Sequence, residues 1–578
     1  MTVANALFEH VARNPSLHLT IFTALTLEPP RPAPGLEARF LGPVIERTMG
    51  GSPRLAYATA LRNGTMPANI VVHEFFLLAG RWLSVPRVQQ DYVAANYTHA
   101  ARYVIQRGVN VVAQLVARRS VGGAPRYSLS CNTDLTLDFL SARKEGTASF
   151  ILVGEINDEL PFMPGEGDLE ANNFAHVLDD DKGFPLFAPP KEPVGLREHA
   201  IGLNVARLVR DGGTLQLGIG EESDATVHAL ILRQKQNEHF RAAVEALTEG
   251  QPSLSGEQLS VFASGLYGVS EMFVDGFLAL LREGVLKREV GGVLLHAAFF
   301  LGTRAFYRAL REMPDEMLQR IAMTAVSFTN ELGQDEAKRA ARARARFINS
   351  TMMSTLAGEA ISDTLEDGRV VSGVGGQFNF VAQAFELQDA RSILTFKATR
   401  GEGKRERSNV RWSYAHPTVP RHLKDIFVSE YGVADLRGKS DGETVAAMLA
   451  IADSRFQPEL LRAAKEARKI ASGFEIPRVF RENTPDRISR ALKPLAEEGL
   501  LPAFPLGTDF DQTELALLPL LERLQKASGL ARARILFGGL VRDRPSAEEA
   551  GLLARMGLAT PRTVEEHIFR GLLRGVRS

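Results

Sequence analysis

Short apolar runs alternate with helix-period segments along most of this chain, and this alternation constrains the fold more than any other feature. The segments 199–210 and 441–452 show helical periodicity. Between such segments, the predicted strands are 110–119, 127–139, 148–157, 214–220, 321–328, 369–376, 391–399 and 425–432. A chain that alternates strands with helices typically forms largely parallel sheets. The sequence therefore predicts an α/β fold.

The length and the polar breaks divide the chain into domains. A chain of 578 residues is too long for one hydrophobic core, so we expect at least two domains. Residues 236–258 are polar and carry Pro and Gly breaks, which predicts a linker or an inserted helix between domains at 1–235 and 259–475. Amphipathic segments with Ser, Thr or Pro near their starts predict a helical extension over 476–578.

Composition excludes several classes of function. The 68 basic and 68 acidic residues give a net charge of zero, so no global field attracts nucleic acid, although a local basic pocket remains compatible with this balance. Cys131 is the only cysteine, so no intramolecular disulfide forms and the chain suits a reducing cytosol. The first residues do not resemble a secretory signal, and no apolar run reaches the about 20 residues of a membrane span. We expect a cytoplasmic protein that binds neither nucleic acid nor membrane.

Two glycine-rich turns follow predicted strands. In "TLQLGIGEES", Gly218 and Gly220 precede a helix that begins near Ser223, where backbone amides could meet a phosphate; a plain tight turn is the alternative. In "VVSGVGGQFNF", Gly373, Gly375 and Gly376 precede another helix. Glycine permits close approach of a ligand there, and two successive amides could hold an oxyanion, so a ligand site and a structural turn are equally compatible.

Two carboxylates stand at notable positions. Apolar spacing predicts a helix over 268–284 with Glu271 at its start, where an acid offsets the helix dipole and has a lowered pKa. Glu430 ends a predicted strand, the place where α/β proteins bind ligands, although an exposed strand end is the alternative. The motifs HExxH, CxxC and GxSxG are absent, so zinc and serine-triad catalysis are not expected.

Most of residues 70 to 470 resembles the acetyl-CoA hydrolase/transferase family, which includes acetate, butyrate, succinate and 4-hydroxybutyrate CoA-transferases. The resemblance is carried, in order, by "HEFFLLAGRWLSVPRVQQDYVAANYTH", "RGVNVVAQLVA", "REHAIGLNVARLVRDGGTLQLGIG", "SEMFVDGFLALLREGVL", "FFLGTRAFYRAL", "SFTNE", "INSTMMSTLAGEAISD", "SGVGGQFNFV" and "SEYGVADLRGKSDGETVAAMLAIADSRF". It implies two CoA-transferase-like α/β domains and a homodimer.

The resemblance also implies roles for individual residues. The family's glutamate nucleophile, usually in His-Thr-Glu-Met followed by Asp-Gly, falls on Glu271 in "VSEMFVDG". The partners around the thioester oxygen fall on Asn330 and on Gly376, and a further active-site carboxylate falls on Glu430. Asn379 stands where the family usually has Asp after Gly-Gly-Gln, which alters the CoA contacts or the local charge.

These assignments imply ping-pong transfer of CoA from a short-chain acyl-CoA to a small carboxylic acid through a glutamyl-CoA thioester. No metal ligands and no permanently bound cofactor are expected, because coenzyme A is itself a substrate. A hydrolase that uses water, and a CoA-binding protein without catalysis, are the alternatives. Candidate CoA-binding residues are the turn glycines, two polar residues that follow them and nearby cations: Gly218, Gly220, Gly373, Gly375, Gln377, Asn379, Lys397, Arg400 and Lys404.

Overall fold

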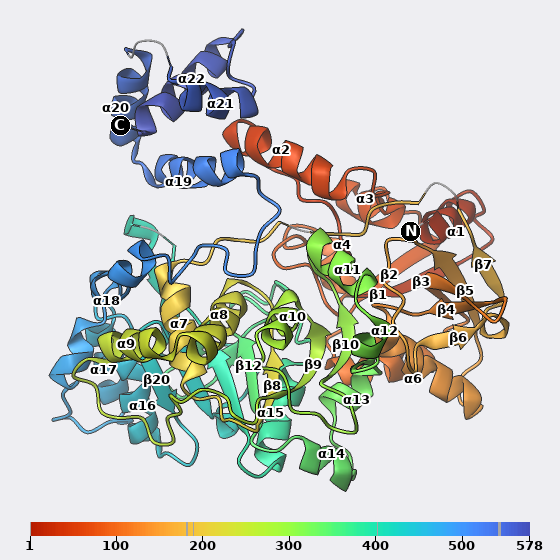
Figure 1. Ribbon diagram of the computed structural model, residues 1–578, viewed down its shortest axis with the longest axis horizontal. Helices are drawn as coiled ribbons and strands as arrows, with labels where there is room; N and C mark the ends of the chain where they lie inside the picture. Colours follow the sequence, from red (N-terminus) through yellow and green to blue (C-terminus); the bar gives the residue numbers. More distant parts are fainter. Residues whose placement is uncertain (1, 181–182, 189, 402, 542–544, 578) are drawn as a thin grey trace. The chain divides into compact units, whose positions relative to one another are not determined.

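The computed structural model describes residues 2–180, 183–188, 190–401, 403–541 and 545–577. The chain forms two compact units, each built from separate stretches of sequence (Figure 1). The larger unit comprises Met1–Leu27, Pro53–Phe184 and Glu192–Leu506. The smaller unit comprises Glu28–Ser52, Pro185–Lys191 and Gly507–Ser578.

An eight-stranded sheet is the centre of the larger unit, in the order β11-β10-β9-β8-β12-β15-β19-β20. Every neighbouring pair is parallel except β19 and β20, which confirms the α/β fold with largely parallel sheets. The strands are β8 (Thr214–Leu217), β9 (Tyr267–Phe273), β10 (Leu295–Phe300), β11 (Ile321–Met323), β12 (Arg346–Ser350), β15 (Arg391–Thr395), β19 (Ile426–Ser429) and β20 (Gly432–Asp435).

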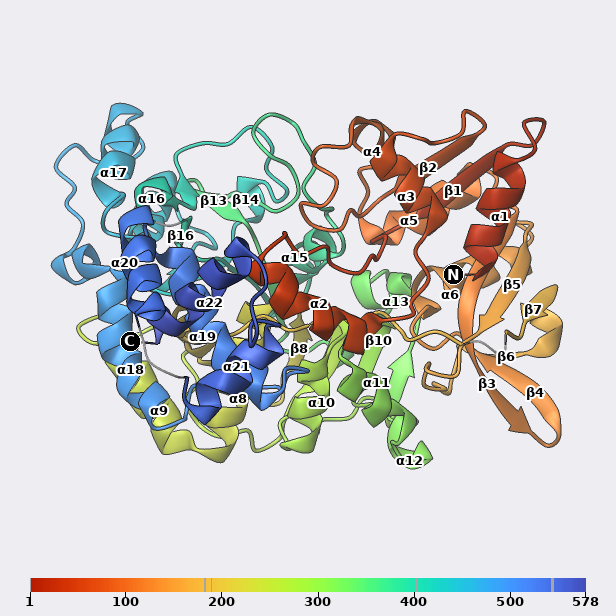
Figure 2. The ribbon, with the colours of Figure 1, turned by 90° about the horizontal axis from the view of Figure 1, so that it is seen from above.

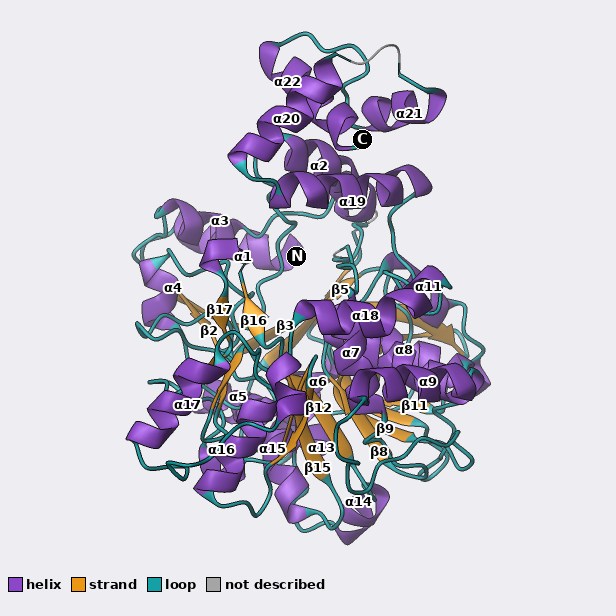
Figure 3. Cartoon of the chain, turned by 90° about the vertical axis from the view of Figure 1, so that its left-hand side faces the viewer, coloured by secondary structure: helices purple, strands orange, loops and turns teal. Residues whose placement is uncertain are grey.

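Helices cover both faces of this sheet. Figures 1 and 3 show α7 (Leu196–Ala206), α8 (Glu221–Lys235) and α9 (Asn237–Thr248) on one side, and α15 (Gln377–Glu386) on the other. Every residue of β8 and β19 is buried, as expected for parallel strands packed on both faces. The remaining helices around this sheet are α10 (Asp275–Arg282), α11 (Arg304–Arg311), α12 (Asp315–Leu318), α13 (Val326–Asn330), α14 (Glu336–Ala341), α16 (Asp441–Ala450), α17 (Gln457–Glu466) and α18 (Pro485–Glu497).

A second, five-stranded sheet lies in the N-terminal part, in the order β6-β4-β3-β5-β7 (Figure 2). Its strands are β3 (Val111–Val121), β4 (Ala124–Ser128), β5 (Ile151–Ile156), β6 (Asp168–Glu170) and β7 (His176–Leu178). Beside it, β1 (Leu19–Thr23) and β2 (Ile70–Glu74) form a parallel pair. The helices of this part are α1 (Thr2–Ala12), α3 (Ala56–Asn63), α4 (Pro86–Asp91), α5 (Tyr97–Gln106) and α6 (Thr133–Lys144).

Short elements complete the larger unit. A three-stranded sheet contains β13 (Met353–Thr355), β14 (Ala360–Ile361) and β18 (Val410–Arg411), and a two-stranded sheet contains β16 (Thr399–Arg400) and β17 (Arg407–Ser408). Single 3-10 turns are Ala171–Asn173, Gly403–Arg405, Arg421–Leu423 and Arg478–Glu482.

Helices alone make up the regular structure of the smaller unit in its described residues: α2 (Leu36–Met49), α19 (Gln512–Lys526), α20 (Gly529–Leu540), α21 (Ala547–Arg555) and α22 (Val564–Val576). The fully buried carboxylate of Glu514 in α19 pairs with Arg47 of α2 at 2.7 Å and with Arg555 of α21 at 2.6 Å. The predicted C-terminal helices are confirmed, but the sequence did not indicate that α2 packs with them.

Four local predictions are wrong in whole or in part. The predicted strand 321–328 ends at Met323, and α13 begins at Val326. Residues 268–284 contain strand β9 and then α10, because β9 pairs with β8 and β10. The predicted strand 127–139 ends at Ser128, and α6 begins at Thr133. The predicted strand 369–376 forms only isolated bridges, such as the one between Gly375 and Asn96, because its glycines hold the chain in an irregular turn.

The predicted domain boundaries at 235 and 259 stay a prediction. One strand from the predicted first domain lies in the eight-stranded sheet. Strand β8, which the sequence analysis placed within 1–235, pairs with β9 and β12 in the eight-stranded sheet. The segment 236–258 contains helix α9. No described helix is both long and apolar enough to span a bilayer.

Close packing of α7 on α8 gives a test of the fold. A Cβ added to Gly202 of α7 would lie 2.5 Å from the carbonyl carbon of Ala225 in α8, so we expect Gly202→Ala to destabilise the larger unit by about 1–3 kcal/mol. Gly442→Ala in α16 is the matched control, because its nearest atom would lie 3.4 Å away. Thermal unfolding of the two variants checks this, and equal midpoints would contradict the packing.

Candidate active site

Glu271 projects from β9, two residues before that strand ends. Strand β9 is held between β8 and β10, and the Ser270 hydroxyl donates to the carbonyl of Leu217 in β8 at 3.1 Å. Because Leu215 lies opposite Gly268 in this pairing, the register brings Gly218 to the level of Glu271. Glu271 therefore lies near the carboxyl edge of the parallel sheet, where α/β proteins bind ligands.

Asn330, the last residue of α13, donates a hydrogen bond from its side-chain amide to Glu271 Oε2 at 2.5 Å. The Thr329 hydroxyl donates to Asn330 Oδ1 at 2.9 Å, which fixes the orientation of the Asn330 amide. Gln383 of α15 donates to the Asn330 carbonyl at 2.7 Å, and the buried Arg342 donates to the Gln383 side chain. This chain of hydrogen bonds holds the Asn330 donor against Glu271.

The turn at Gly375 and Gly376 completes the group around Glu271. A Cβ at Gly376 would lie 1.9 Å from Glu271 Oε2 and 2.3 Å from Asn330 Nδ2, so only glycine fits there. Gly375 has φ +56°, and its carbonyl accepts a hydrogen bond from the Tyr97 amide at 3.0 Å. The structure thus brings together three of the predicted catalytic residues, Glu271, Asn330 and Gly376, with the candidate CoA-binding residue Gly375 beside them.

Burial raises the pKa of Glu271 to about 7, against the lowering effect of the Asn330 hydrogen bond. The charge of Asp134 raises this pKa further. The expected helix dipole does not act on Glu271, because Glu271 lies in a strand and α10 begins only at Asp275. The expected lowered pKa is therefore wrong.

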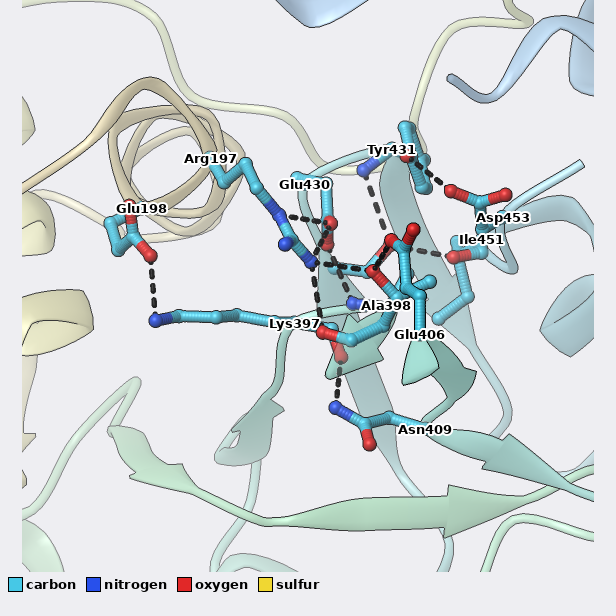
Figure 4. A network of polar contacts seen from close by, with 12 residues as sticks. Arg197, Glu198, Lys397, Ala398, Glu406, Asn409, Glu430, Tyr431, Ile451 and Asp453 are labelled. Carbon is cyan, nitrogen blue, oxygen red and sulfur yellow. Dashed lines mark hydrogen bonds and ion pairs between the residues drawn. The ribbon is translucent and has the colours of Figure 1, made fainter. Parts of the chain in front are cut away.

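Glu430 has a different environment. Its carboxylate is buried just after β19, and it accepts hydrogen bonds from Arg197 at 2.8 Å and from the Ala398 amide at 2.8 Å (Figure 4). Burial raises the pKa of Glu430, and the charge of Arg197 opposes this shift. Arg197 also donates to the Thr399 carbonyl and hydroxyl at 3.1 and 3.2 Å. Among the described residues, the side-chain partner of Glu430 is Arg197.

The first glycine turn lies among carboxylates. Gly220 has φ +98° and precedes α8, whose first turn carries Glu221 and Glu222. Lys397 pairs with Glu221 at 2.8 Å and with Glu198 at 2.7 Å, and these carboxylates raise its pKa against the effect of burial. A phosphate at Gly218 and Gly220 would have to compete with these carboxylates for Lys397, so this anion site stays a prediction.

The remaining candidate CoA-binding residues lie in three places. Gln377 and Asn379 are buried in the first turn of α15, where Gln377 donates to the Ser350 carbonyl at 2.9 Å and Asn379 donates to the Thr98 hydroxyl at 3.2 Å. Gly373 packs on Phe76, which leaves no room for a side chain. The two cations lie at β16 and after it: Arg400 donates to Asn409 at 2.6 Å, and Lys404 is exposed in a 3-10 turn.

Several residues around Glu271 were not predicted from the sequence. Tyr97 and Asp134 lie in α5 and α6, far from Glu271 in sequence, and the Tyr97 hydroxyl donates to Asp134. Thr329 directly precedes Asn330 in "SFTNE", so the predicted role of Asn330 could have pointed to Thr329. Asp134 gave no signal, because it lies in a segment that the apolar pattern predicted as a strand.

The raised pKa of Glu271 gives a test that needs no substrate. A carboxyl with a pKa of about 7 in the folded chain and 4.5 as its ordinary value binds more protons when folded, so its contribution to stability is lost as pH rises from 4.5 to 7. That loss amounts to about 3 kcal/mol. Glu271→Gln should therefore unfold at a higher temperature than the wild type at pH 8, with a smaller difference at pH 5.

Glu145→Gln, at the exposed end of α6, is the control for the loss of a carboxylate. A constant difference in unfolding midpoint between Glu271→Gln and the wild type from pH 5 to pH 8 would show that the pKa of Glu271 is not raised.

Comparisons with known proteins find CoA-transferases similar to this chain. Residues 302–464 match the acetyl-CoA hydrolase/transferase C-terminal domain. The chain is 26% identical over 340 residues to the 4-hydroxybutyrate coenzyme A transferase of Clostridium kluyveri, covering 58% of this chain and 69% of that one. It is 25% identical over 352 residues to the succinyl-CoA:cyclohexane-1-carboxylate CoA transferase of Geobacter metallireducens, covering 60% of this chain and 69% of that one.

Solved structures share the fold. RipA from Yersinia pestis is 20% identical, with a TM-score of 0.57 over 80% of this chain and 97% of that chain. The 4-hydroxybutyrate CoA-transferase of Porphyromonas gingivalis is 21% identical, with a TM-score of 0.51 over 79% of this chain and 96% of that chain. The resemblance drawn from the sequence is confirmed, because residues 302–464 match the model of the acetyl-CoA hydrolase/transferase C-terminal domain and the relatives are named as CoA-transferases.

Proposed function

We propose that this chain is a CoA-transferase that moves CoA between a short-chain acyl-CoA and a free carboxylate, with Glu271 as the nucleophile. The observation that carries the proposal is the contact of Glu271 with the Asn330 amide, closed by a glycine turn on which no side chain fits. Relatives named as CoA-transferases, from Clostridium kluyveri and Geobacter metallireducens, support the reaction class.

The first half of the reaction transfers CoA to the protein. The ionised carboxylate of Glu271 attacks the thioester carbonyl and forms a tetrahedral intermediate. Its carbon–sulfur bond then breaks, which releases CoA as a thiolate and leaves a mixed anhydride between the acyl group and Glu271. The thiolate then attacks the glutamyl carbonyl of this anhydride, which releases the acyl group as a carboxylate and leaves Glu271 as a glutamyl-CoA thioester. The incoming carboxylate reverses these steps and leaves as a new acyl-CoA.

Each addition step forms a tetrahedral oxyanion that needs hydrogen-bond donors. The Asn330 side-chain amide and the Gly376 backbone amide are the groups we assign to this role, because the Asn330 amide contacts Glu271 Oε2 and the Gly376 backbone lies against the same oxygen. In the resting state the Asn330 amide hydrogen-bonds the nucleophile itself. When Glu271 joins the substrate, the same donor is in place for the oxygen that becomes negatively charged.

Exchange and hydrolysis can be separated in one experiment. The protein is incubated with acetyl-CoA and a panel of carboxylates, and acyl-CoA exchange and free-thiol release are followed separately. We expect exchange without thiol release, and borohydride reduction of the intermediate should change the mass of the one peptide that contains Glu271. Thiol release without an acceptor would instead identify a hydrolase, and failure to bind CoA would overturn both reactions.

The hydroxyl of Thr329 gives a sharper test of the site, because it hydrogen-bonds Asn330 Oδ1 at 2.9 Å as well as the Val326 carbonyl of the same helix at 3.3 Å. Thr329→Val keeps the side-chain shape but removes the donor, so we expect the exchange rate to fall by about ten- to a hundredfold, less than the loss for a missing oxyanion donor. Thr329→Ser keeps the hydroxyl and should retain most of the rate. Equal rates in the Val and Ser variants would contradict the role given to Asn330.

A further inference from the structure

A tyrosine–aspartate pair lies beside Glu271 and has no part in the mechanism above. The Tyr97 hydroxyl donates to Asp134 Oδ2. The charge of Asp134 raises the pKa of Glu271, and the charge of Glu271 raises the pKa of Tyr97. The register of β9 and β10 places Ala298 opposite Glu271, and Asp134 follows Thr133, whose hydroxyl donates to the Ala298 carbonyl. A second carboxyl group therefore lies beside the nucleophile.

Several contacts hold this pair in a fixed place. The Tyr97 amide donates to the Gly375 carbonyl at 3.0 Å. The Tyr97 ring packs edge-on against the Phe299 ring, with the two ring centroids 5.9 Å apart. Phe299 pairs with Met272, the residue after Glu271. Thr133, the residue before Asp134, donates a hydrogen bond from its hydroxyl to the Ala298 carbonyl in β10 at 2.7 Å.

The helix that carries Asp134 is also joined to the helix that carries Asn330. The Ser327 hydroxyl of α13 donates to Asp138 Oδ1 in α6 at 2.6 Å. Strand β10 and helices α5, α6 and α13 therefore fix the Tyr97–Asp134 pair relative to the Glu271 group. Such rigid support is what a group needs in order to impose a constant field on its neighbour.

We propose that Asp134, held by Tyr97, is a positioning residue that controls through its charge whether Glu271 is ionised, so that the two carboxyl groups share one proton near neutral pH. The inference rests on the proposed role of Glu271 as nucleophile. Two carboxylates in one buried site do not both ionise readily. A proton on Asp134 leaves Glu271 anionic and able to attack, whereas a proton on Glu271 blocks the attack.

The other groups around the pair are consistent with this assignment. Burial raises the pKa of Asp134 to about 6, and the hydrogen bond from Tyr97 opposes this shift. Asp138, in the next turn of α6, raises the pKa of Asp134, and Glu331 after α13 raises the pKa of Asp138. The charge of Asp134 raises the pKa of the Cys131 thiol before α6. Two interacting carboxyls titrate as one system, so the pH profile belongs to the pair.

Once Glu271 is a neutral thioester, its negative charge no longer acts on Asp134, while the charge of Asp138 remains. The Asp134 carboxyl then ionises more readily, and the shared proton passes to solvent. Formation of the glutamyl-CoA intermediate should therefore release a proton at pH values where the resting pair holds one. The bond changes at Glu271 are unchanged by this step, because the proton comes from the carboxyl pair alone.

The test compares Asp134→Asn and Tyr97→Phe with Glu145→Gln, whose carboxylate is exposed at the far end of α6. The measurement is the pH profile of kcat/KM for CoA exchange. We expect the acid limb of the profile to move down by about one pH unit in Asp134→Asn. The acid limb should move less in Tyr97→Phe. Loss of the Tyr97 hydrogen bond raises the pKa of Asp134, so Asp134 keeps the proton more often and Glu271 is more often ionised. The acid limb should stay in place in Glu145→Gln.

Proton release on mixing with acetyl-CoA, followed with a pH indicator at pH 6.5, is the second readout, and it requires only a single turnover. It should be present in the wild type and reduced in Asp134→Asn. An unmoved acid limb, or unchanged proton release, in an active Asp134→Asn variant would overturn the inference. Absence of the thioester in the wild type would instead refute the proposed function, so the two failures are distinguishable.

Discussion

The hydrogen bond from Asn330 to Glu271 is the contact on which the rest of the candidate site depends. It joins two residues that lie 59 positions apart in sequence, and it leaves space on the remaining side only for a residue without a side chain. The parallel sheet sets the place of Glu271, and the chain through Thr329, Gln383 and Arg342 sets the direction of the amide. Position 376 must be glycine, because any Cβ there would overlap Glu271 and Asn330.

The burial of Glu271 in this arrangement raises its pKa. A nucleophilic carboxylate is most reactive when it is poorly solvated, but burial also favours its protonated form. Here the Asn330 hydrogen bond favours the ionised form while burial and Asp134 oppose it, and the balance lies at about 7. The site therefore operates where small changes in its surroundings decide the charge of Glu271.

Much of the fold was predictable because its signals are local. The apolar runs at β5, β8, β15 and β19 and the helices α7 and α16 follow from periodicity. Strand β9 was not predictable this way, because its residues also show helical spacing and only pairing with β8 and β10 decides between the two. The packing of α2 with α19 and α21 likewise depends on the buried carboxylate of Glu514. This carboxylate pairs with Arg47 and Arg555, which lie near opposite ends of the sequence.

The candidate site divides in the same manner. Glu271, Asn330 and Gly376 were indicated by motifs, and the structure brings them into contact. Glu430 was indicated by its place after a strand, but its partner Arg197 comes from α7 and could not be foreseen. Tyr97 and Asp134 carry no motif, and only the fold places them beside Glu271.

An oxygen-isotope experiment tests the central claim most directly. When an acceptor carboxylate labelled with ¹⁸O in both oxygens attacks the glutamyl-CoA thioester, one labelled oxygen bridges the anhydride and stays on the protein after the thiolate removes the acyl group. The mechanism predicts ¹⁸O in the Glu271 side chain after turnover, located by mass spectrometry of its peptide. Turnover that leaves Glu271 unlabelled would show that this carboxylate is not the nucleophile.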